Sequence, residues 1–177
     1  MNTEQKIVFF DVDGTIYQIG RGMPESTRKA IAKLKENGHI PVMCTGRPKP
    51  SVFPEVLEPD FPGMICGAGT YIEYEGRILR NVLISNELLM QQVPRLEKIG
   101  CCVVLEGPEY LSCRPDRETR ELFSIVDRLE REYPERLKEM DLLTDRACKL
   151  TAKIPDMAAF ERLVPELERA FELARYE

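Results

Sequence analysis

The chain has 177 residues and a formal net charge of −5, with 25 basic and 30 acidic side chains. This length suffices for one large domain or two small ones, and 43% apolar residues is an ordinary share for a folded globular protein. A protein that grips a nucleic-acid backbone needs a surplus of basic residues, so we expect no nucleic-acid partner. No apolar run is long enough to cross a bilayer and no signal-peptide pattern opens the chain, so we expect a cytoplasmic protein with no membrane partner.

The first 80 residues alternate between predicted strands and helices. Compact apolar runs predict strands at 7–10, 40–44 and 64–66, and the first of these is expected to be buried. Helical patterns and their end signals predict helices at 24–37 and 48–57. Two further strands flank Glu75-Gly76, a hairpin signal. Strand and helix in alternation predict an α/β unit with a parallel sheet and crossover helices.

The second half of the chain has a different pattern of elements. Helices are predicted at 85–99, 116–132 and 156–174, and strands at 101–105, 110–113 and 147–154, whereas 133–146 has no clear pattern. Long helices with few strands favour a separate α+β domain. We therefore expect two domains, at residues 1–83 and 84–177.

Two aspartates follow the first predicted strand, in the stretch FFDVDGT at 9–15. In an open α/β sheet the carboxyl ends of the strands bind ligands. A carboxylate there can attack an electrophile if a cation neutralises the charge, and a second one can carry protons. A calcium-binding loop is excluded, because that pattern needs its glycine at the sixth position and an acid at the twelfth. An ordinary solvated turn remains the alternative for this motif alone.

A second motif, VMCTGR at 42–47, ends the next predicted strand. Parallel neighbours joined by a right-handed crossover end on the same side, so Thr45 is expected near Asp11. Its hydroxyl and the adjacent backbone N–H groups can bind phosphoryl oxygens. The two motifs together favour a site for a phosphorylated ligand over a solvated turn.

On these two motifs the chain resembles the haloacid dehalogenase superfamily, and within it the Cof-like sugar-phosphate phosphatases of subfamily II. The resemblance implies a partial Rossmann-like parallel sheet followed by an inserted α+β cap domain. It implies hydrolysis of a small phosphorylated metabolite through an aspartyl-phosphate intermediate, with Mg²⁺ as cofactor.

The resemblance also implies roles for individual residues. Asp11 corresponds to the nucleophile and Asp13 to the general acid/base. Asp11 and the backbone carbonyl of Asp13 correspond to Mg²⁺ ligands. Thr45, Gly46 and Arg47 correspond to the substrate-binding motif.

The chain departs from the family pattern in two places. After the third strand an Asn-Gly-Ala is common in the family, but residues 68–70 read Ala-Gly-Thr. The family continues past the cap with a lysine motif and a Gly-Asp-x-x-x-Asp motif, and neither occurs here; Lys149 and Lys153 lie in the wrong context. Three hypotheses stay open: an active phosphatase, an inactive remnant that acts as a binding module, and a site that another chain or a second copy completes.

The missing motifs also bear on assembly. In the full family fold, strands that follow the cap flank the strand carrying the nucleophile. Without them, the run at 7–10 is expected to become a sheet edge with unpaired backbone groups and an apolar surface beside it. Such edges pair readily with other chains, so we expect a homo-oligomer formed through this edge, or a rearrangement that covers it.

Overall fold

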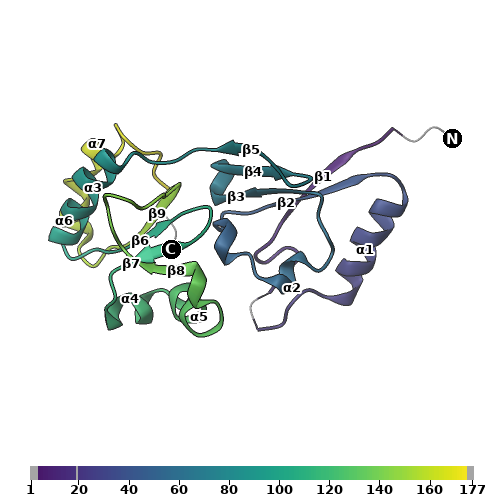
Figure 1. Cartoon of the computed structure of the whole chain (residues 1–177), viewed down its shortest axis with the longest axis horizontal. Coiled ribbons are helices and arrows are strands. Elements are labelled where there is room, and N and C mark those ends of the chain that lie inside the picture. The colour runs from purple at the N-terminus through teal and green to yellow at the C-terminus, as the bar shows by residue number, and fades with distance from the viewer. Residues whose placement is uncertain (1–3, 19, 175–177) are drawn as a thin grey trace. The chain divides into compact units, whose positions relative to one another are not determined.

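The computed structural model describes residues 4–18 and 20–174 and divides into two compact units, residues 1–82 and 83–177 (Figure 1). Each unit has its own sheet and its own cluster of buried apolar side chains. Within the described ranges, no helix is long and apolar enough to cross a membrane.

The first unit is a five-stranded sheet with the order β1-β2-β3-β4-β5. Its first three strands are parallel, and β4 and β5 form an antiparallel hairpin. The elements in chain order are β1 Ile7–Asp11, α1 Glu25–Glu36, β2 Ile40–Cys44, a 3₁₀ turn Lys49–Ser51, α2 Pro54–Leu57, β3 Gly63–Cys66, a 3₁₀ turn Gly67–Gly69, β4 Tyr71–Tyr74 and β5 Arg77–Asn81. The predicted α/β class with a parallel sheet is confirmed.

The hairpin between β4 and β5 forms where the sequence predicts it. Glu75 and Gly76 both have positive φ, at 47° and 74°. Two successive positive φ angles give a tight turn whose twist matches the flanking strands.

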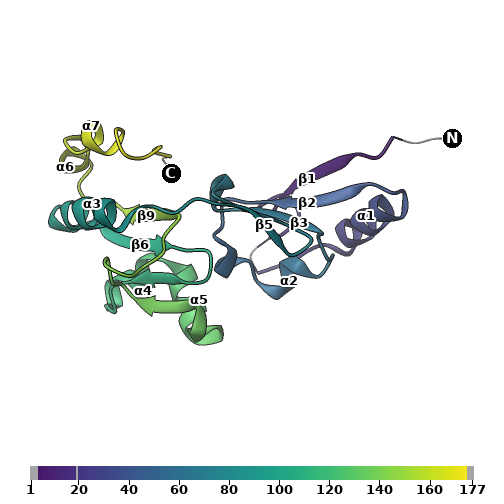
Figure 2. The same cartoon turned by 45° about the horizontal axis from the view of Figure 1, so that its top comes forward.

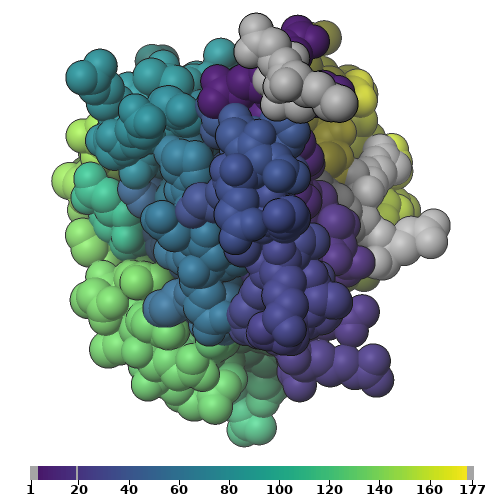
Figure 3. Space-filling model, turned by 90° about the vertical axis from the view of Figure 1, so that its right-hand side faces the viewer, coloured from purple at the N-terminus to yellow at the C-terminus, as the bar shows by residue number. Residues whose placement is uncertain are grey.

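The helices of this unit cover one face of its sheet. Ile31 of α1 and Val56 of α2 pack with Met43 of β2 in one buried cluster, and both helices lie on the same side of the strands (Figure 2). Helix α1 lies on the surface of the unit (Figure 3), and Ile31 is its buried residue. The predicted single helix at 48–57 is wrong, because Pro54 starts a new turn and α2 spans only Pro54–Leu57.

Strand β1 lies at the edge of the sheet. Among the described residues it pairs only with β2. Ile7 and Phe9 are 56% and 58% exposed, on the face away from α1 and α2. The expectation of a buried strand is therefore wrong for this face, because no described helix covers it. The expectation of an edge strand is correct.

The second unit is a four-stranded sheet with the order β8-β7-β6-β9 and helices on both faces (Figure 2). Apolar side chains of α3, α6 and α7 pack on one face, and α4 and α5 cover the other. The elements are α3 Asn86–Lys98, β6 Cys102–Glu106, β7 Leu111–Cys113, α4 Arg117–Leu122, α5 Ser124–Glu132, a 3₁₀ turn Pro134–Arg136, β8 Leu137–Glu139, β9 Lys149–Lys153, α6 Met157–Glu161 and α7 Val164–Leu167.

Two long helices predicted for this unit are broken in the structure. The span 116–132 divides at Phe123, which has extended backbone angles and ends α4 before α5 begins. The span 156–174 gives only α6 and α7, because Pro165 cannot donate the backbone hydrogen bond that a continuous helix requires. The start of α3 is as predicted, since the Ser85 hydroxyl accepts from the Leu88 N–H at 3.2 Å.

We expect Gly107→Ala to lower the free energy of unfolding of the second unit by about 2 kcal/mol or more. A Cβ at Gly107 would lie 2.3 Å from the carbonyl oxygen of Arg146 and 2.9 Å from that of Tyr110. Both contacts are backbone, so no side chain can rotate away to relieve them. Gly46→Ala is the matched control, because its added Cβ meets nothing within 4 Å. Denaturant unfolding followed by circular dichroism measures both, and unchanged stability in Gly107→Ala would contradict this packing.

Candidate active site

The chain reverses direction immediately after β1. Asp11 is the last residue of the strand, and the carbonyl of the fully buried Val12 accepts from the N–H groups of Ile16 and Tyr17 at 3.1 and 2.9 Å. Gly14 makes this turn with a φ of +76°, a region that glycine enters without strain. The turn keeps the second aspartate at the carboxyl end of the strand that carries the first.

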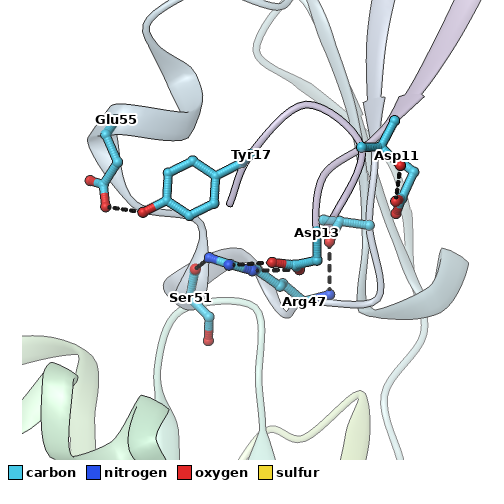
Figure 4. Close-up of polar contacts among 8 residues, drawn as sticks. Asp11, Asp13, Tyr17, Arg47, Ser51 and Glu55 are labelled. Carbon is cyan, nitrogen blue, oxygen red and sulfur yellow. Dashed lines mark hydrogen bonds and ion pairs between the residues drawn. The ribbon is translucent and has the colours of Figure 1, made fainter. Parts of the chain in front are cut away.

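The Asp11 carboxylate is exposed and held by one hydrogen bond. The Thr15 hydroxyl donates to Asp11 Oδ2 at 2.8 Å (Figure 4). Asp11 Oδ1 accepts no hydrogen bond from any residue in the described ranges. One carboxylate oxygen is thus fixed while the other is open to a ligand.

Thr45 lies at the same edge of the sheet as Asp11. The register pairs Asp11 with Cys44, so Thr45 follows one residue beyond that pair. Its side chain is buried, and its Oγ1 accepts from the Arg47 N–H at 3.1 Å. The structure therefore brings the two predicted motifs together, as the parallel register requires.

The Arg47 side chain binds Asp13. Arg47 Nε donates to Asp13 Oδ2 at 2.8 Å and Nη2 donates to Oδ1 at 2.5 Å, which is a two-point ion pair (Figure 4). Arg47 Nη1 also donates to the carbonyl oxygen of Ser51 at 3.1 Å. Sequence patterns do not reveal this pair, because its members are 34 positions apart and neither is part of a periodic pattern.

Tyr17 and Glu55 are further residues of this region that the sequence motifs do not indicate. The Tyr17 hydroxyl donates to Glu55 Oε1 at 3.1 Å, which joins the loop after β1 to α2 (Figure 4). The Arg47 guanidinium carbon lies 5.5 Å from the centre of the Tyr17 ring. Tyr17 stands between Ile16 and Gln18 in the sequence, so no motif there indicates this contact.

A polar trio anchors the chain just after Arg47. Lys49 Nζ lies 2.5 Å from Glu73 Oε2 and donates to the Tyr71 hydroxyl at 3.1 Å, and that hydroxyl donates to the same Glu73 oxygen. The hydrogen bonds from Lys49 and Tyr71 lower the pKa of the Glu73 carboxyl despite its burial. Burial acts to lower the pKa of Lys49, but the hydrogen bonds to Glu73 and Tyr71 raise it overall. The trio ties the turn that follows Arg47 to strand β4.

The oxygen atoms at the end of β1 match the preferences of Mg²⁺. Asp11 Oδ2 keeps a lone pair beside the hydrogen bond from Thr15, and the Asp13 carbonyl accepts no hydrogen bond from the described part of the chain. No group of three or more His, Cys, Asp or Glu side chains suited to a metal lies within residues 4–18 and 20–174. Mg²⁺ binds through one or two carboxylates and keeps several waters, so these residues fit a largely hydrated ion.

The comparisons with known proteins decide the family. The haloacid dehalogenase-like hydrolase family matches residues 8–176. The chain belongs to the haloacid dehalogenase-like hydrolases. The expected resemblance is thereby confirmed, and the superfamily's phosphatases are its relatives in both sequence and fold.

Three known proteins illustrate the match. The Bacillus subtilis (strain 168) protein named "Putative phosphatase YkrA" is 35% identical over 86 residues, which are 48% of this chain and 34% of YkrA. A solved structure from Geobacillus kaustophilus HTA426 matches 98% of this chain and 66% of its own, with a TM-score of 0.75 and 21% identity. The subclass IIB sugar phosphatase BT4131 matches 93% of this chain and 64% of its own, with a TM-score of 0.71 and 18% identity.

The chain therefore spans about a third of YkrA and about two thirds of the two solved chains. The likeness to the solved structures shows a shared fold. The roles predicted for Asp11, Asp13, Thr45, Gly46 and Arg47 stay predictions, because the fold alone assigns no chemistry to a residue.

Proposed function

We propose that this chain carries the nucleophile and general acid/base of a phosphohydrolase that acts on small phosphorylated metabolites. The observation that carries the proposal is the meeting of three groups at one edge of the first sheet. These are the open carboxylate oxygen of Asp11, the second carboxylate of Asp13 and the buried hydroxyl of Thr45.

In the first step Asp11 Oδ1 attacks the phosphorus atom of the ester. A bond forms between this oxygen and phosphorus, and the bond from phosphorus to the ester oxygen breaks. Asp13 gives a proton to the departing oxygen, so the product alcohol leaves neutral. The aspartyl phosphate stays on Asp11.

In the second step water cleaves the aspartyl phosphate. Asp13 takes a proton from the attacking water, the bond between phosphorus and Asp11 breaks, and inorganic phosphate leaves. Asp11 returns to a free carboxylate and Asp13 to its protonated form, so one phosphate ester and one water give one alcohol and one phosphate.

Thr45 and Gly46 are proposed to hold the phosphoryl group. Arg47 N–H occupies one lone pair of the Thr45 oxygen, and no acceptor among residues 4–18 and 20–174 takes its hydroxyl proton. That proton can be donated to a phosphoryl oxygen. Mg²⁺, held by Asp11 and the Asp13 carbonyl, would supply positive charge against the two anions.

We propose sugar phosphates as the substrate class. They are esters whose alcohol leaving group needs a proton, and Asp13 is proposed to give it. The sugar phosphatase BT4131 shares the fold, which supports this choice. The test is release of inorganic phosphate from a panel of sugar phosphates with Mg²⁺ in the buffer. Turnover of at least one member is expected. Binding of sugar phosphates without any release of phosphate would instead favour a binding module.

We expect Mg²⁺ to bind the isolated chain only weakly. One carboxylate oxygen and one carbonyl leave most of the six positions around the ion to water, so little of its hydration is replaced. Isothermal titration calorimetry is expected to give an affinity weaker than micromolar, and weaker still in Asp11→Asn. A micromolar or tighter site in the wild-type chain would contradict the donor set described above.

A further inference from the structure

The Asp13 carboxylate is bound by Arg47. Both of its oxygens accept from Arg47, and within the described residues it accepts from no other group. Asp13 stands in a loop, and its side chain is 48% exposed. Without Arg47, nothing described would hold this carboxylate in one orientation.

Arg47 is itself held in one place. Its side chain is only 14% exposed, and Nη1 donates to the Ser51 carbonyl. The guanidinium carbon lies 5.5 Å from the centre of the Tyr17 ring and 6.0 Å from that of Phe53. A planar guanidinium fixed by stacking and by a backbone acceptor is preorganised for two-point binding of a carboxylate.

We propose that Arg47 is the positioning residue of Asp13 and does not act as a ligand of the substrate phosphate. This inference rests on the proposed function and refines it. Asp13 must reach the ester oxygen in one step and the attacking water in the next. A guanidinium that holds the Asp13 side chain sets the position from which Asp13 gives the first proton and at which it takes the second.

The proposal predicts a loss that depends on the leaving group. A general acid matters for an alkyl phosphate, whose alcohol needs a proton, and little for p-nitrophenyl phosphate, whose phenolate leaves unaided. The parameter kcat/KM reports the steps up to formation of the aspartyl phosphate. In Arg47→Met it should fall about 100-fold for glucose 6-phosphate but less than about 5-fold for p-nitrophenyl phosphate.

Three variants make this test specific. Asp13→Asn should show the same dependence on the leaving group, and Arg47→Met added to Asp13→Asn should cost little more. Arg47→Lys should recover part of the loss, because it restores one of the two contacts. Arg28→Met is the matched control, because Arg28 also pairs with a carboxylate, through Nε and Nη2 to Glu58 Oε2, and donates to a carbonyl, that of Met23. In Arg28→Met the ratio of kcat/KM for glucose 6-phosphate to kcat/KM for p-nitrophenyl phosphate should equal that of the wild type.

The outcomes separate the inference from the function on which it rests. Equal losses for both esters in Arg47→Met, with a raised KM, would show that Arg47 binds the phosphate and would overturn the inference alone. An Arg47→Met variant with wild-type kinetics would do the same. A wild-type chain that hydrolyses neither ester would overturn the proposed function and this inference with it.

Discussion

Asp11→Asn is expected to reduce the turnover of phosphate esters by a factor on the order of 10³ or more. The amide keeps the shape of the side chain but removes the charge and nucleophilicity of the free carboxylate oxygen. The hydrogen bond from Thr15 can persist, since the amide oxygen still accepts, so the loss should be chemical and not structural. Phosphate release and thermal unfolding, measured on the same preparations, separate the two effects.

The matched control for this variant is Asp60→Asn. Asp60 lies in the same unit, its side chain is 95% exposed, and it forms an ion pair with Lys35. Its φ of 54° is a conformation that asparagine also adopts readily. Turnover in Asp60→Asn should match the wild type. Near wild-type turnover in Asp11→Asn would show that the activity arises elsewhere.

The second large effect concerns assembly: we expect two copies of the chain to associate through β1. No strand among the described residues pairs with the outer side of β1, and residues 7–10 contain neither proline nor charge. Ile7 and Phe9 extend this edge into an exposed apolar surface on the same strand. Both features favour pairing with another strand, and a second copy offers the same edge for antiparallel pairing about a twofold axis.

Phe9→Lys should abolish this association, because it would place a charge within the paired surface. Ile78→Lys on β5, the opposite edge strand, is the matched control, since Ile78 is 59% exposed against 58% for Phe9. Sedimentation velocity over a range of concentrations should show a dimer for the wild type and for Ile78→Lys, and a monomer for Phe9→Lys. A wild-type chain that stays monomeric throughout would contradict the prediction.

The sequence allows the meeting of Asp11 and Thr45 to be predicted, because it follows from backbone rules. Adjacent parallel strands end on the same side, so motifs at their ends must lie close together. The hairpin at Glu75-Gly76 and the cap at Ser85 are equally local. Each depends on a few neighbouring residues whose preferences agree with the fold.

Features that depend on distant partners could not be predicted in this way. An apolar run is the same in sequence whether a helix covers it or not, so the run at 7–10 by itself predicts a buried strand, although Ile7 and Phe9 are exposed. The pair between Asp13 and Arg47 depends on which rotamers meet across two loops. The break at Phe123 interrupts a run with good helical periodicity, and the sequence there contains neither proline nor glycine to announce it.

The measurement that tests the central claim most directly is chemical trapping of the phosphoryl group on Asp11. The chain is mixed with Mg²⁺ and a phosphate ester that it hydrolyses, and the reaction is quenched. Borohydride is then added, which reduces an aspartyl phosphate to homoserine. Peptide mass spectrometry is expected to find homoserine at position 11 in the wild type and none there in Asp11→Asn. Turnover without homoserine at position 11, or with the modification at another carboxylate, would contradict the mechanism proposed for this site.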